Sequence, residues 1–391
     1  MKKKLIFITE ALWIGGIEAA LVNLLNQLDY TRYDVTCLIL RDCQDFASRI
    51  TAPCRLIVSD RQHPVSFSTA YPHSRMYNLM EEPQNPTKLR RLIWRMLRLC
   101  LRAPEARRYA AYVKEQLGDV HFDTAIIYSD RVAEIAVRAV PADRFLMFYH
   151  HGAMRREYHD EYGYRQAERI IAVSEALAEK LRAFRPRYGE KIIAIHNLID
   201  IAGVREKSLE TPSICFPKDC FNLVSCGRLS PAKGMDLAVH ACARLVQRGH
   251  TRIHWWIVGG GPEERALREL IREKGLEDYV TLLGMQSNPY PYIRQADLYV
   301  QPSRFEAFGL TILEAMVLGK PVLSTETDGG REIIHSGLTG KLCPPDSASI
   351  AAAIQGLYAA PEELSRYCAA LEQENFDLAN EEIMGKLYAL L

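Results

Sequence analysis

The sequence lacks the features that mark zinc-binding, secreted and membrane-spanning proteins. Its ten cysteines are scattered, with no Cys-x-x-Cys pair and no Cys/His cluster at zinc-ligand spacing. We expect these cysteines to be small buried apolar residues. No segment reaches the roughly 18 apolar residues that span a bilayer. The apolar run Leu5–Ile8 is too short for the core of a secretory signal and is followed by Thr9 and Glu10, so we expect a cytoplasmic protein.

The net charge of +1 hides an uneven distribution. Residues 1–200 contain 30 Lys and Arg against 24 Asp and Glu, whereas the rest of the chain contains 19 against 24. The basic first half indicates an encounter with an anionic membrane surface, with a phosphorylated acceptor, or with no charged partner at all.

Regular alternation of short apolar segments and longer amphipathic segments is the main pattern that is present. At 391 residues the chain is longer than one hydrophobic core usually supports, so two domains are expected. Strands are predicted at Lys4–Thr9, Tyr33–Leu40, Thr124–Tyr128, Phe145–Tyr149, Arg169–Val173, Ile192–His196, Phe221–Cys226, His254–Val258, Tyr279–Leu283, Leu298–Gln301 and Pro321–Ser324. Helices are predicted at Ile17–Leu28, Arg131–Val140, Met235–Arg248, Pro262–Lys274 and Phe308–Leu318. The alternation predicts two doubly wound α/β domains with parallel sheets.

The helical and strand patterns are weakest at residues 206–218, where prolines and serines interrupt them, and this segment is the predicted linker. We expect an N-terminal domain of residues 1–205, a C-terminal domain of residues 206–373, and a final helix of residues 374–391 that packs on the N-terminal domain. Residues 60–84, rich in Pro, Ser and His, predict a long loop.

Residues 88–102 predict a basic amphipathic helix. Four arginines, at positions 91, 95, 98 and 102, share one face, and apolar residues with Trp94 lie on another. This pattern is typical of a helix that lies on an anionic membrane, and it also fits a helix that packs on its domain with a solvated arginine face.

Two predicted strands of the second half end in loops with cations or glycines. Arg228 and Lys233 follow the strand that ends at Cys226, at the edge of a parallel sheet where ligands bind. Both cations suit phosphate, although either residue can also form an ordinary surface ion pair. Gly259, Gly260 and Gly261 precede a helix, where backbone amides suit an anion or form an ordinary tight turn. Gly-x-Gly-x-x-Gly spacing is missing, which disfavours a nicotinamide-dinucleotide site.

The segment from Leu298 to Met316 carries the strongest signal. A strand leads into a loop with Glu306, and a helix follows near Phe308 and Gly309. The amides of residues 308–310 would then lie at the start of that helix, where they suit phosphate. Glu314 lies eight residues after Glu306, so both carboxylates are expected to face one cleft and to accept bonds from sugar or ribose hydroxyls.

Taken together, these motifs resemble the retaining glycosyltransferase family 4, of the two-Rossmann-domain type called GT-B, in which two doubly wound domains face a central cleft. The resemblance runs through nearly the whole chain. It is carried by Gly15-Gly16-Ile17-Glu18, by Gly-Arg-Leu-x3-Lys-Gly at 227–234, by residues 259–262, by Glu306 and Glu314 as the family's Glu-x7-Glu motif, and by the segments 319–322 and 328–332. Asn197-Leu198-Ile199-Asp200 departs from the family's frequent Asn-x-Gly-x-Asp by lacking the glycine.

The resemblance implies roles for individual residues. Arg228 and Lys233 would bind the donor diphosphate and stabilise the leaving group without a metal ion. Glu306 would hold hydroxyls of the transferred sugar, and Glu314 would bind the ribose. The further donor-binding residues implied are Gly16, Gly261, Met285, Gln286, Phe308, Gly309 and Leu310. His151 would be the active-site histidine, with His150 as the alternative.

The implied reaction moves a hexosyl or N-acetylhexosaminyl unit from a nucleotide sugar, with UDP favoured over GDP, and retains the anomeric configuration. A lipid-linked or surface-polysaccharide acceptor at the inner membrane face is expected from the basic helix and the basic first half. The alternatives are a soluble acceptor, as in glycogen or sucrose synthases, a GT-B sugar epimerase, and a non-catalytic partner of another transferase. No cofactor, metal or nucleic-acid partner is expected.

Overall fold

The computed structural model describes residues 2–41, 43–59, 107–150, 154 and 161–391. The predicted loop at 60–84, the basic helix at 88–102 and His151 lie outside the described residues. The chain divides into two compact units. The first comprises Met1–Tyr149, Met154–Ile171 and Phe184–Ile193, and the second comprises His150–Ala153, Ala172–Ala183 and Ala194–Leu391.

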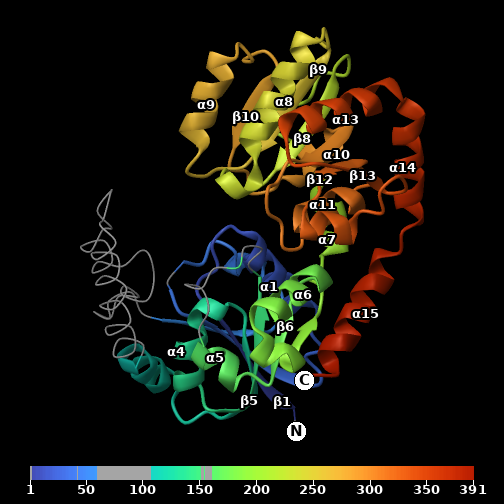
Figure 1. The fold of residues 1–391 in the computed structure, drawn as a ribbon. Coiled ribbons are helices and arrows are strands. Elements are labelled where there is room, and N and C mark those ends of the chain that lie inside the picture. The colour runs from blue at the N-terminus through green and yellow to red at the C-terminus, as the bar shows by residue number, and fades with distance from the viewer. Residues whose placement is uncertain (1, 42, 60–106, 151–153, 155–160) are drawn as a thin grey trace. The chain divides into compact units, whose positions relative to one another are not determined.

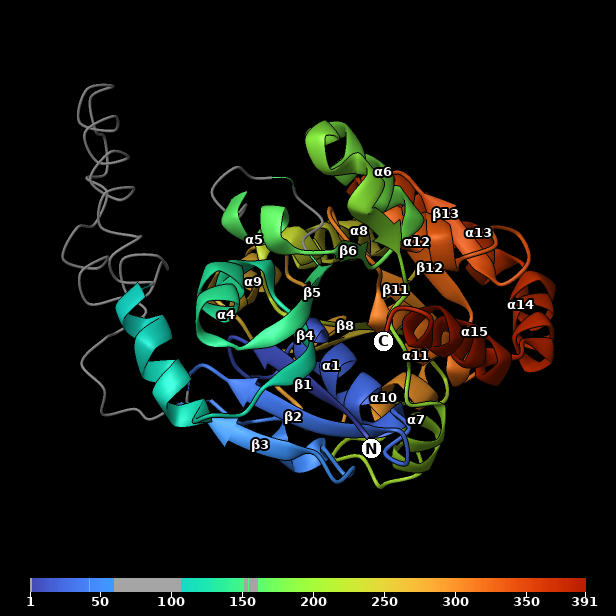
Figure 2. The ribbon, with the colours of Figure 1, turned by 90° about the horizontal axis from the view of Figure 1, so that it is seen from below.

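The first sheet has a doubly wound order. Its strands, as far as the chain is described, are β1 (Lys3–Thr9), β2 (Tyr33–Ile39), β3 (Arg55–Val58), β4 (Phe122–Ile127), β5 (Ala142–Tyr149), β6 (Arg169–Ala172) and β7 (Ile192–Ala194), in the order β3-β2-β1-β4-β5-β6-β7. Figure 2 shows β3, β2, β1, β4 and β5 side by side. β1 pairs in parallel with β2 and with β4, which makes the gap between β1 and β4 the point where the chain reverses direction across the sheet. Residues 5–8 of β1 are fully buried, as expected for a central strand of a parallel sheet.

Short helices connect these strands. They are α1 (Gly16–Gln27), α4 (Ala133–Ala139) and α5 (Glu161–Gln166), and residues 107–117 are also helical. α6 (Glu175–Phe184) follows β6, and its residues up to Ala183 group with the second unit.

The second sheet repeats the same topology. Its strands are β8 (Phe221–Cys226), β9 (Ile253–Val258), β10 (Val280–Gly284), β11 (Leu298–Gln301), β12 (Val322–Thr325) and β13 (Gly340–Cys343), in the order β10-β9-β8-β11-β12-β13. All five neighbouring pairs are parallel. β8 and β11 lie next to each other at the switch point, with β9 beside β8 and β12 beside β11. Figure 1 shows this sheet in yellow and orange.

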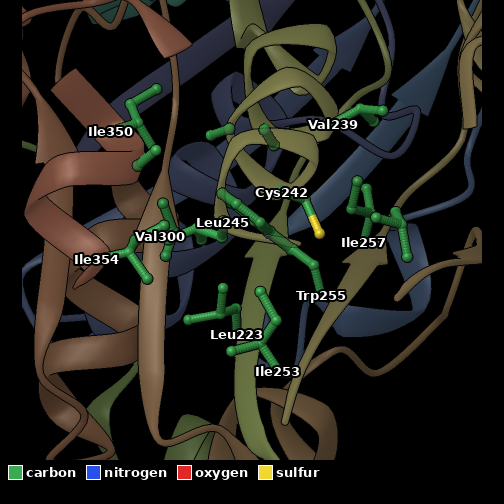
Figure 3. Packing of buried hydrophobic residues seen from close by; sticks show 14 of the residues in the cluster. Leu223, Val239, Cys242, Leu245, Ile253, Trp255, Ile257, Val300, Ile350 and Ile354 are labelled. Atoms are coloured by element: carbon green, nitrogen blue, oxygen red, sulfur yellow. The ribbon is translucent and has the colours of Figure 1, made fainter. Parts of the chain in front are cut away.

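Helices cover both faces of the second sheet. The helices described after residue 200 are α7 (Ile201–Lys207), α8 (Met235–Gln247), α9 (Glu264–Glu273), α10 (Tyr290–Gln295), α11 (Leu310–Val317), α12 (Asp328–Ile333), α13 (Ser347–Ala359), α14 (Pro361–Gln373) and α15 (Phe376–Tyr388). One core joins the sheet to α8, α9 and α13, with Leu223, Trp255 and Val300 pointing into it (Figure 3). The other core joins the sheet to α7, α10 and α11 through the alternate strand positions, such as Val224 and Tyr299. This alternation explains why apolar residues occupy successive positions in these strands, as at residues 255–258 of β9.

The prediction of two Rossmann-like α/β domains with parallel sheets is confirmed. All eleven predicted strands are present with small shifts at their ends, whereas β3 and β13 were not predicted. The predicted domain limits and the packing of the final helix on the first domain stay predictions.

The expectation that the cysteines are buried is only partly right. Among the nine described cysteines, Cys37, Cys226, Cys242 and Cys343 are buried, four others are half-buried, and Cys215 is exposed. Cys215 lies in the segment 208–220, which forms neither helix nor strand and does not pack its cysteine against a sheet.

Candidate functional site

Two loops meet at the carboxyl edge of the second sheet. One leaves β8 at Gly227, and the other leaves β11 at Pro302. β8 and β11 are neighbours whose connections run in opposite directions, so the switch point of the sheet lies between them. In open α/β sheets this switch point is where ligands bind.

Lys233 is fixed in the first of these loops by the glycine that follows it. Gly234 adopts φ +63°, a left-handed conformation that disfavours other residues, and a β-carbon there would lie 2.1 Å from the Pro302 carbonyl oxygen. The Arg304 amide donates to the Ala232 carbonyl oxygen at 2.8 Å, so the two loops are also bonded directly. Lys233 therefore leaves a backbone that the neighbouring loop holds in place.

An arginine–aspartate pair closes the same junction. The Arg304 guanidinium donates to both carboxylate oxygens of Asp236, at 2.7 and 2.6 Å. The hydrogen bond from Arg304 lowers the pKa of Asp236 below its ordinary value. Such bidentate pairs fix geometry as well as charge. Sequence reasoning missed both residues because neither was distinguishable from an ordinary surface charge.

The Lys233 ammonium contacts both carboxylate oxygens of Glu306, at 2.8 and 2.7 Å. The Glu306 side chain is 9% exposed and the Lys233 side chain 24%. The Ser303 hydroxyl donates to the same carboxylate at 3.1 Å, and the Gln301 amide donates to Ser303 at 2.7 Å. Glu306 is thus held at the end of a hydrogen-bonded chain that starts on the buried strand β11.

Arg228 has a different environment. It lies in the loop after β8, its side chain is exposed, and it has no ion-pair or hydrogen-bond partner among the residues that the structure describes. A guanidinium in this state can bind phosphate oxygens in bidentate geometry without first breaking another interaction.

The start of α11 lies next to Glu306. Gly309 caps this helix with φ +104°, and Phe308 before it is buried. The first amides of a helix have no acceptor inside it and carry partial positive charge, which suits an anion. The amide of Gly329 donates to the Glu306 carbonyl oxygen at 3.0 Å, and this bond links the loop to α12. The predicted helix start at 308–309 is confirmed to within two residues.

Glu314 lies on α11 and accepts a hydrogen bond from the Tyr290 hydroxyl at 3.1 Å. Glu306 lies before the helix, so helical spacing does not relate the two carboxylates. Burial raises the pKa of Tyr299 of β11 well above its ordinary value, and both carboxylates add to the shift.

The predicted base-binding residues occupy the loop after β10. Met285 is 55% exposed, and a β-carbon on Gly260 would lie 3.1 Å from its methyl group. The Gln286 side-chain amide donates to the Leu283 carbonyl oxygen at 2.7 Å. The two loops after β9 and β10 are therefore in contact.

The three glycines after β9 allow close backbone packing. A β-carbon on Gly259 would lie 1.9 Å from the Gly227 carbonyl oxygen, and one on Gly261 would lie 2.4 Å from that of Leu229. The helix that follows starts at Glu264 with Glu263 as its cap. This geometry favours the tight-turn interpretation of the triple glycine over an anion site at a helix start.

A second group of charged side chains lies at the carboxyl edge of the first sheet. Gly15 caps α1, and a β-carbon there would lie 2.4 Å from a carboxylate oxygen of Glu18. Burial raises the pKa of Glu18 to about 7, with Glu10 adding to the shift. Arg41 contacts Glu10 at 3.1 Å. Sequence reasoning found the Gly15–Glu18 motif and missed Glu10 and Arg41.

The remaining predicted residues differ in what surrounds them. A β-carbon on Gly16 would meet nothing within 4 Å. His150, at the end of β5, is buried. The second unit thus brings together Lys233, Glu306 and the start of α11, with Arg228 in the same loop as Lys233.

Metal-ligand clusters and membrane-spanning helices are absent from the described residues. No group of three or more His, Cys, Asp and Glu within them is arranged to hold a metal ion. No helix within this part of the chain is long and apolar enough to span a membrane.

One family model matches the part of the chain that contains the second sheet. Residues 220–360 match the model described as glycosyl transferases group 1. The matched stretch contains Arg228, Lys233, Glu306 and Glu314.

Three relatives illustrate the sequence similarity. An alpha-D-kanosaminyltransferase of Streptomyces kanamyceticus is 34% identical over 35% of this chain and 36% of its own length. The amylovoran biosynthesis glycosyltransferase AmsK of Erwinia amylovora is 28% identical over 60% of this chain and 59% of its own length. The N-acetylgalactosamine-N,N'-diacetylbacillosaminyl-diphospho-undecaprenol 4-alpha-N-acetylgalactosaminyltransferase of Campylobacter jejuni is 31% identical over 47% of this chain and 48% of its own length. The aligned stretches therefore span less than two thirds of these relatives.

Solved structures resemble the whole chain in fold. HepE of Anabaena, in complex with UDP-glucose, has a TM-score of 0.68 at 19% identity, with 99% of each chain covered. A sucrose-phosphate synthase of Thermosynechococcus elongatus has a TM-score of 0.72 at 19% identity, covering 100% of this chain and 99% of its own. The fold is that of the GT-B glycosyltransferases.

Proposed function

We propose that the protein is a retaining, metal-independent glycosyltransferase of family 4 that uses a nucleotide sugar. The observation that carries this proposal is the Lys233–Glu306 pair beside the start of α11, at the switch point of the second sheet. This edge offers a cation and helix amides for a diphosphate, and a carboxylate for sugar hydroxyls.

The donor is proposed to be a UDP-sugar. The similarity in fold to HepE, which was solved with UDP-glucose, supports this choice. Met285 and Gln286 would border the base, with Gly261 close by, and Glu314 would bind the ribose. The C. jejuni and S. kanamyceticus relatives, whose names describe transfer of amino sugars, support a hexosyl or N-acetylhexosaminyl unit.

In the proposed mechanism, fixed positive groups stabilise the departing diphosphate. Arg228 binds the diphosphate through two parallel hydrogen bonds, and Lys233 moves from Glu306 to the phosphate oxygens. The amides at 308–310 add the positive end of the helix dipole. Glu306 then accepts hydrogen bonds from hydroxyls of the sugar. The leaving phosphate deprotonates the acceptor hydroxyl on the same face, so the new bond forms with retained configuration. His151, or His150, orients groups near the sugar.

The acceptor is proposed to be a lipid-linked or surface polysaccharide intermediate at the inner membrane face. The relatives named for amylovoran biosynthesis and for a diphospho-undecaprenol acceptor support this class. The basic sequence at 88–102 and the basic first half support contact with an anionic membrane.

Turnover of UDP-sugars by purified protein tests the donor site. Arg228→Ala, Lys233→Ala and Glu306→Ala should each lower turnover at least about tenfold, which corresponds to roughly 1.4 kcal/mol of barrier. Arg265→Ala is a matched control, since this arginine is exposed on α9 and its guanidinium lies 3.7 Å from Glu269 of the same helix. Wild-type activity in all three variants would refute the assignment of the site.

Three further measurements test the finer claims. Activity should persist in EDTA, and a requirement for added Mg²⁺ or Mn²⁺ would contradict metal independence. NMR of the product should show the anomeric configuration of the donor. Co-sedimentation with anionic liposomes should occur at low salt and weaken at high salt, and its absence at low salt would remove the membrane claim.

A further inference from the structure

His196, which follows β7, contacts the loop that carries the proposed donor site. The ring of His196 lies 5.4 Å from the ring of Phe308 between centroids, at an interplanar angle of 37°. Phe308 directly precedes the cap of α11 and is 6% exposed, so its side chain is almost completely covered by other protein atoms. The position of the His196 ring therefore bears on the position of Phe308.

Glu332 of α12 holds the His196 ring in place through one of the ring nitrogens. Nε2 of His196 is hydrogen-bonded to a carboxylate oxygen of Glu332. The same carboxylate accepts from the amides of Glu175 at 2.7 Å and Ala176 at 3.3 Å, at the start of α6. Burial raises the pKa of Glu332, but these bonds from His196 and the two amides outweigh burial and bring it below the ordinary value. The carboxylate is thus ionised and satisfied on several sides.

α12 also supports the loop through its backbone. The Gly329 amide donates to the Glu306 carbonyl oxygen at 3.0 Å. A β-carbon on Gly329 would lie 1.9 Å from the Phe308 carbonyl oxygen, so the start of α12 lies directly against residues 306–308. One short helix therefore holds this loop twice, through Gly329 directly and through Glu332 and His196.

We infer that His196 and Glu332 are positioning residues that set donor affinity by holding Phe308 and the first amides of α11. The inference rests on the proposed function, because those amides matter only if they meet a diphosphate. Neither side chain touches the Lys233–Glu306 pair in the described structure, and both act through Phe308. A displacement of about 1 Å at such a site is enough to weaken an aligned contact.

The test uses three variants of the full chain and one matched control. His196→Ala removes the ring and the bond to Glu332, His196→Phe keeps a ring against Phe308, and Glu332→Gln keeps the shape without the charge. The control is Arg331→Ala, which lies next to Glu332 on α12 but pairs with the exposed Glu326 at 2.7 Å. UDP affinity is measured by calorimetry, and the donor KM and kcat are measured with a UDP-sugar.

We expect His196→Ala to weaken UDP binding at least about fivefold and to raise the donor KM by a similar factor, with kcat within about twofold of wild type. His196→Phe and Glu332→Gln should lie between His196→Ala and wild type, and Arg331→Ala should match wild type. A change in KM without a change in kcat, together with partial rescue in His196→Phe, distinguishes a positioning role from a general loss of stability. The melting temperature of each variant measures that stability in parallel.

Three results would overturn the inference. These are wild-type UDP affinity in His196→Ala, equal weakening by Arg331→Ala, and a loss of kcat at unchanged KM. Should His196→Ala fail to fold, unchanged UDP affinity in both His196→Phe and Glu332→Gln would overturn it. If the wild-type chain binds neither UDP nor GDP and turns over neither kind of sugar donor, the proposed function fails too. If it binds and turns over a donor, only the inference is in question.

Discussion

The Pro302 carbonyl oxygen lies 2.1 Å from the point where Gly234 would carry a β-carbon. Two loops that are far apart in the sequence therefore touch backbone to backbone, and the contact lies one residue from Lys233. Any side chain at position 234 must separate the loops or distort one of them.

Gly234→Ala should therefore be much more destabilising than alanine at a glycine with the same backbone conformation. Gly275 is the matched control, because its φ is +62° and a β-carbon there would meet nothing within 4 Å. We expect Gly275→Ala to cost about 1 kcal/mol of unfolding free energy through φ alone, and Gly234→Ala to cost roughly 2 kcal/mol more through the clash. Urea unfolding measures both. Equal costs would show that the loops separate without strain.

Glu306→Gln should separate nucleotide binding from turnover. In the free protein Glu306 competes with phosphate for Lys233, because the ammonium contacts both of its oxygens. Removing the negative charge should tighten the binding of UDP by about threefold, while turnover of a UDP-sugar falls at least about tenfold. Calorimetry and initial rates measure the two effects. Weaker UDP binding in this variant would mean that Glu306 helps to hold the diphosphate directly.

Glu314 should make binding depend on the ribose hydroxyls. Hydrogen bonds to an ionised group contribute about 1.5 kcal/mol or more, so wild type should prefer UDP to 2′,3′-dideoxy-UDP by roughly tenfold. Glu314→Ala should remove most of this preference. Tyr290→Phe is the matched control, because it removes only the hydroxyl that donates to Glu314 at 3.1 Å. A preference that survives Glu314→Ala would assign the ribose to another residue.

The stability of the first unit should fall as the pH rises from about 4.5 to about 7. Burial raises the pKa of Glu18 from 4.5 to about 7 on folding, so the folded chain binds more protons in this window. The stability gained from protonated Glu18 is fully present below the pKa that this residue has in the unfolded chain. It is lost as the pH rises through the pKa of Glu18 in the folded chain. The loss by pH 8 should reach up to about 3 kcal/mol.

Glu18→Gln should flatten this pH dependence and stabilise the unit at pH 8. Glu115→Gln, at an exposed position of the same unit, should leave the dependence unchanged. Hydrogen exchange of the α1 amides at pH 5 and pH 8, corrected for intrinsic rates, reports on this unit separately. An unchanged dependence in Glu18→Gln would assign the effect to other groups.

The sequence predicted the strands well because both faces of each sheet are covered. Central strands such as β1 and β5 contain continuous apolar runs, which are recognisable without any partner. β3 was missed because it lies at the edge of its sheet and two of its four residues are exposed. β13 was missed because it is short and begins with glycine.

The predicted donor-site residues could be chosen from their motifs, but their partners could not. Lys233 and Glu306 are 73 residues apart, and their contact depends on how two loop backbones meet. Ser303 and Tyr290, which hold the two glutamates, lie in segments where polar residues are ordinary. His196 was expected only as the end of a strand, because its contact with Phe308 depends on the tertiary fold.

The pairing of Lys233 with Glu306 has a consequence for which anions can bind at these loops. With the two charges neutralising each other, Arg228 is the cation of these loops that attracts a free phosphate without competition. An anion gains the full attraction of Lys233 only if it also brings hydroxyl groups that satisfy Glu306. A sugar joined to a diphosphate brings both in one molecule, whereas inorganic phosphate brings no sugar hydroxyl to Glu306. The ion pair should therefore favour a sugar diphosphate over free phosphate.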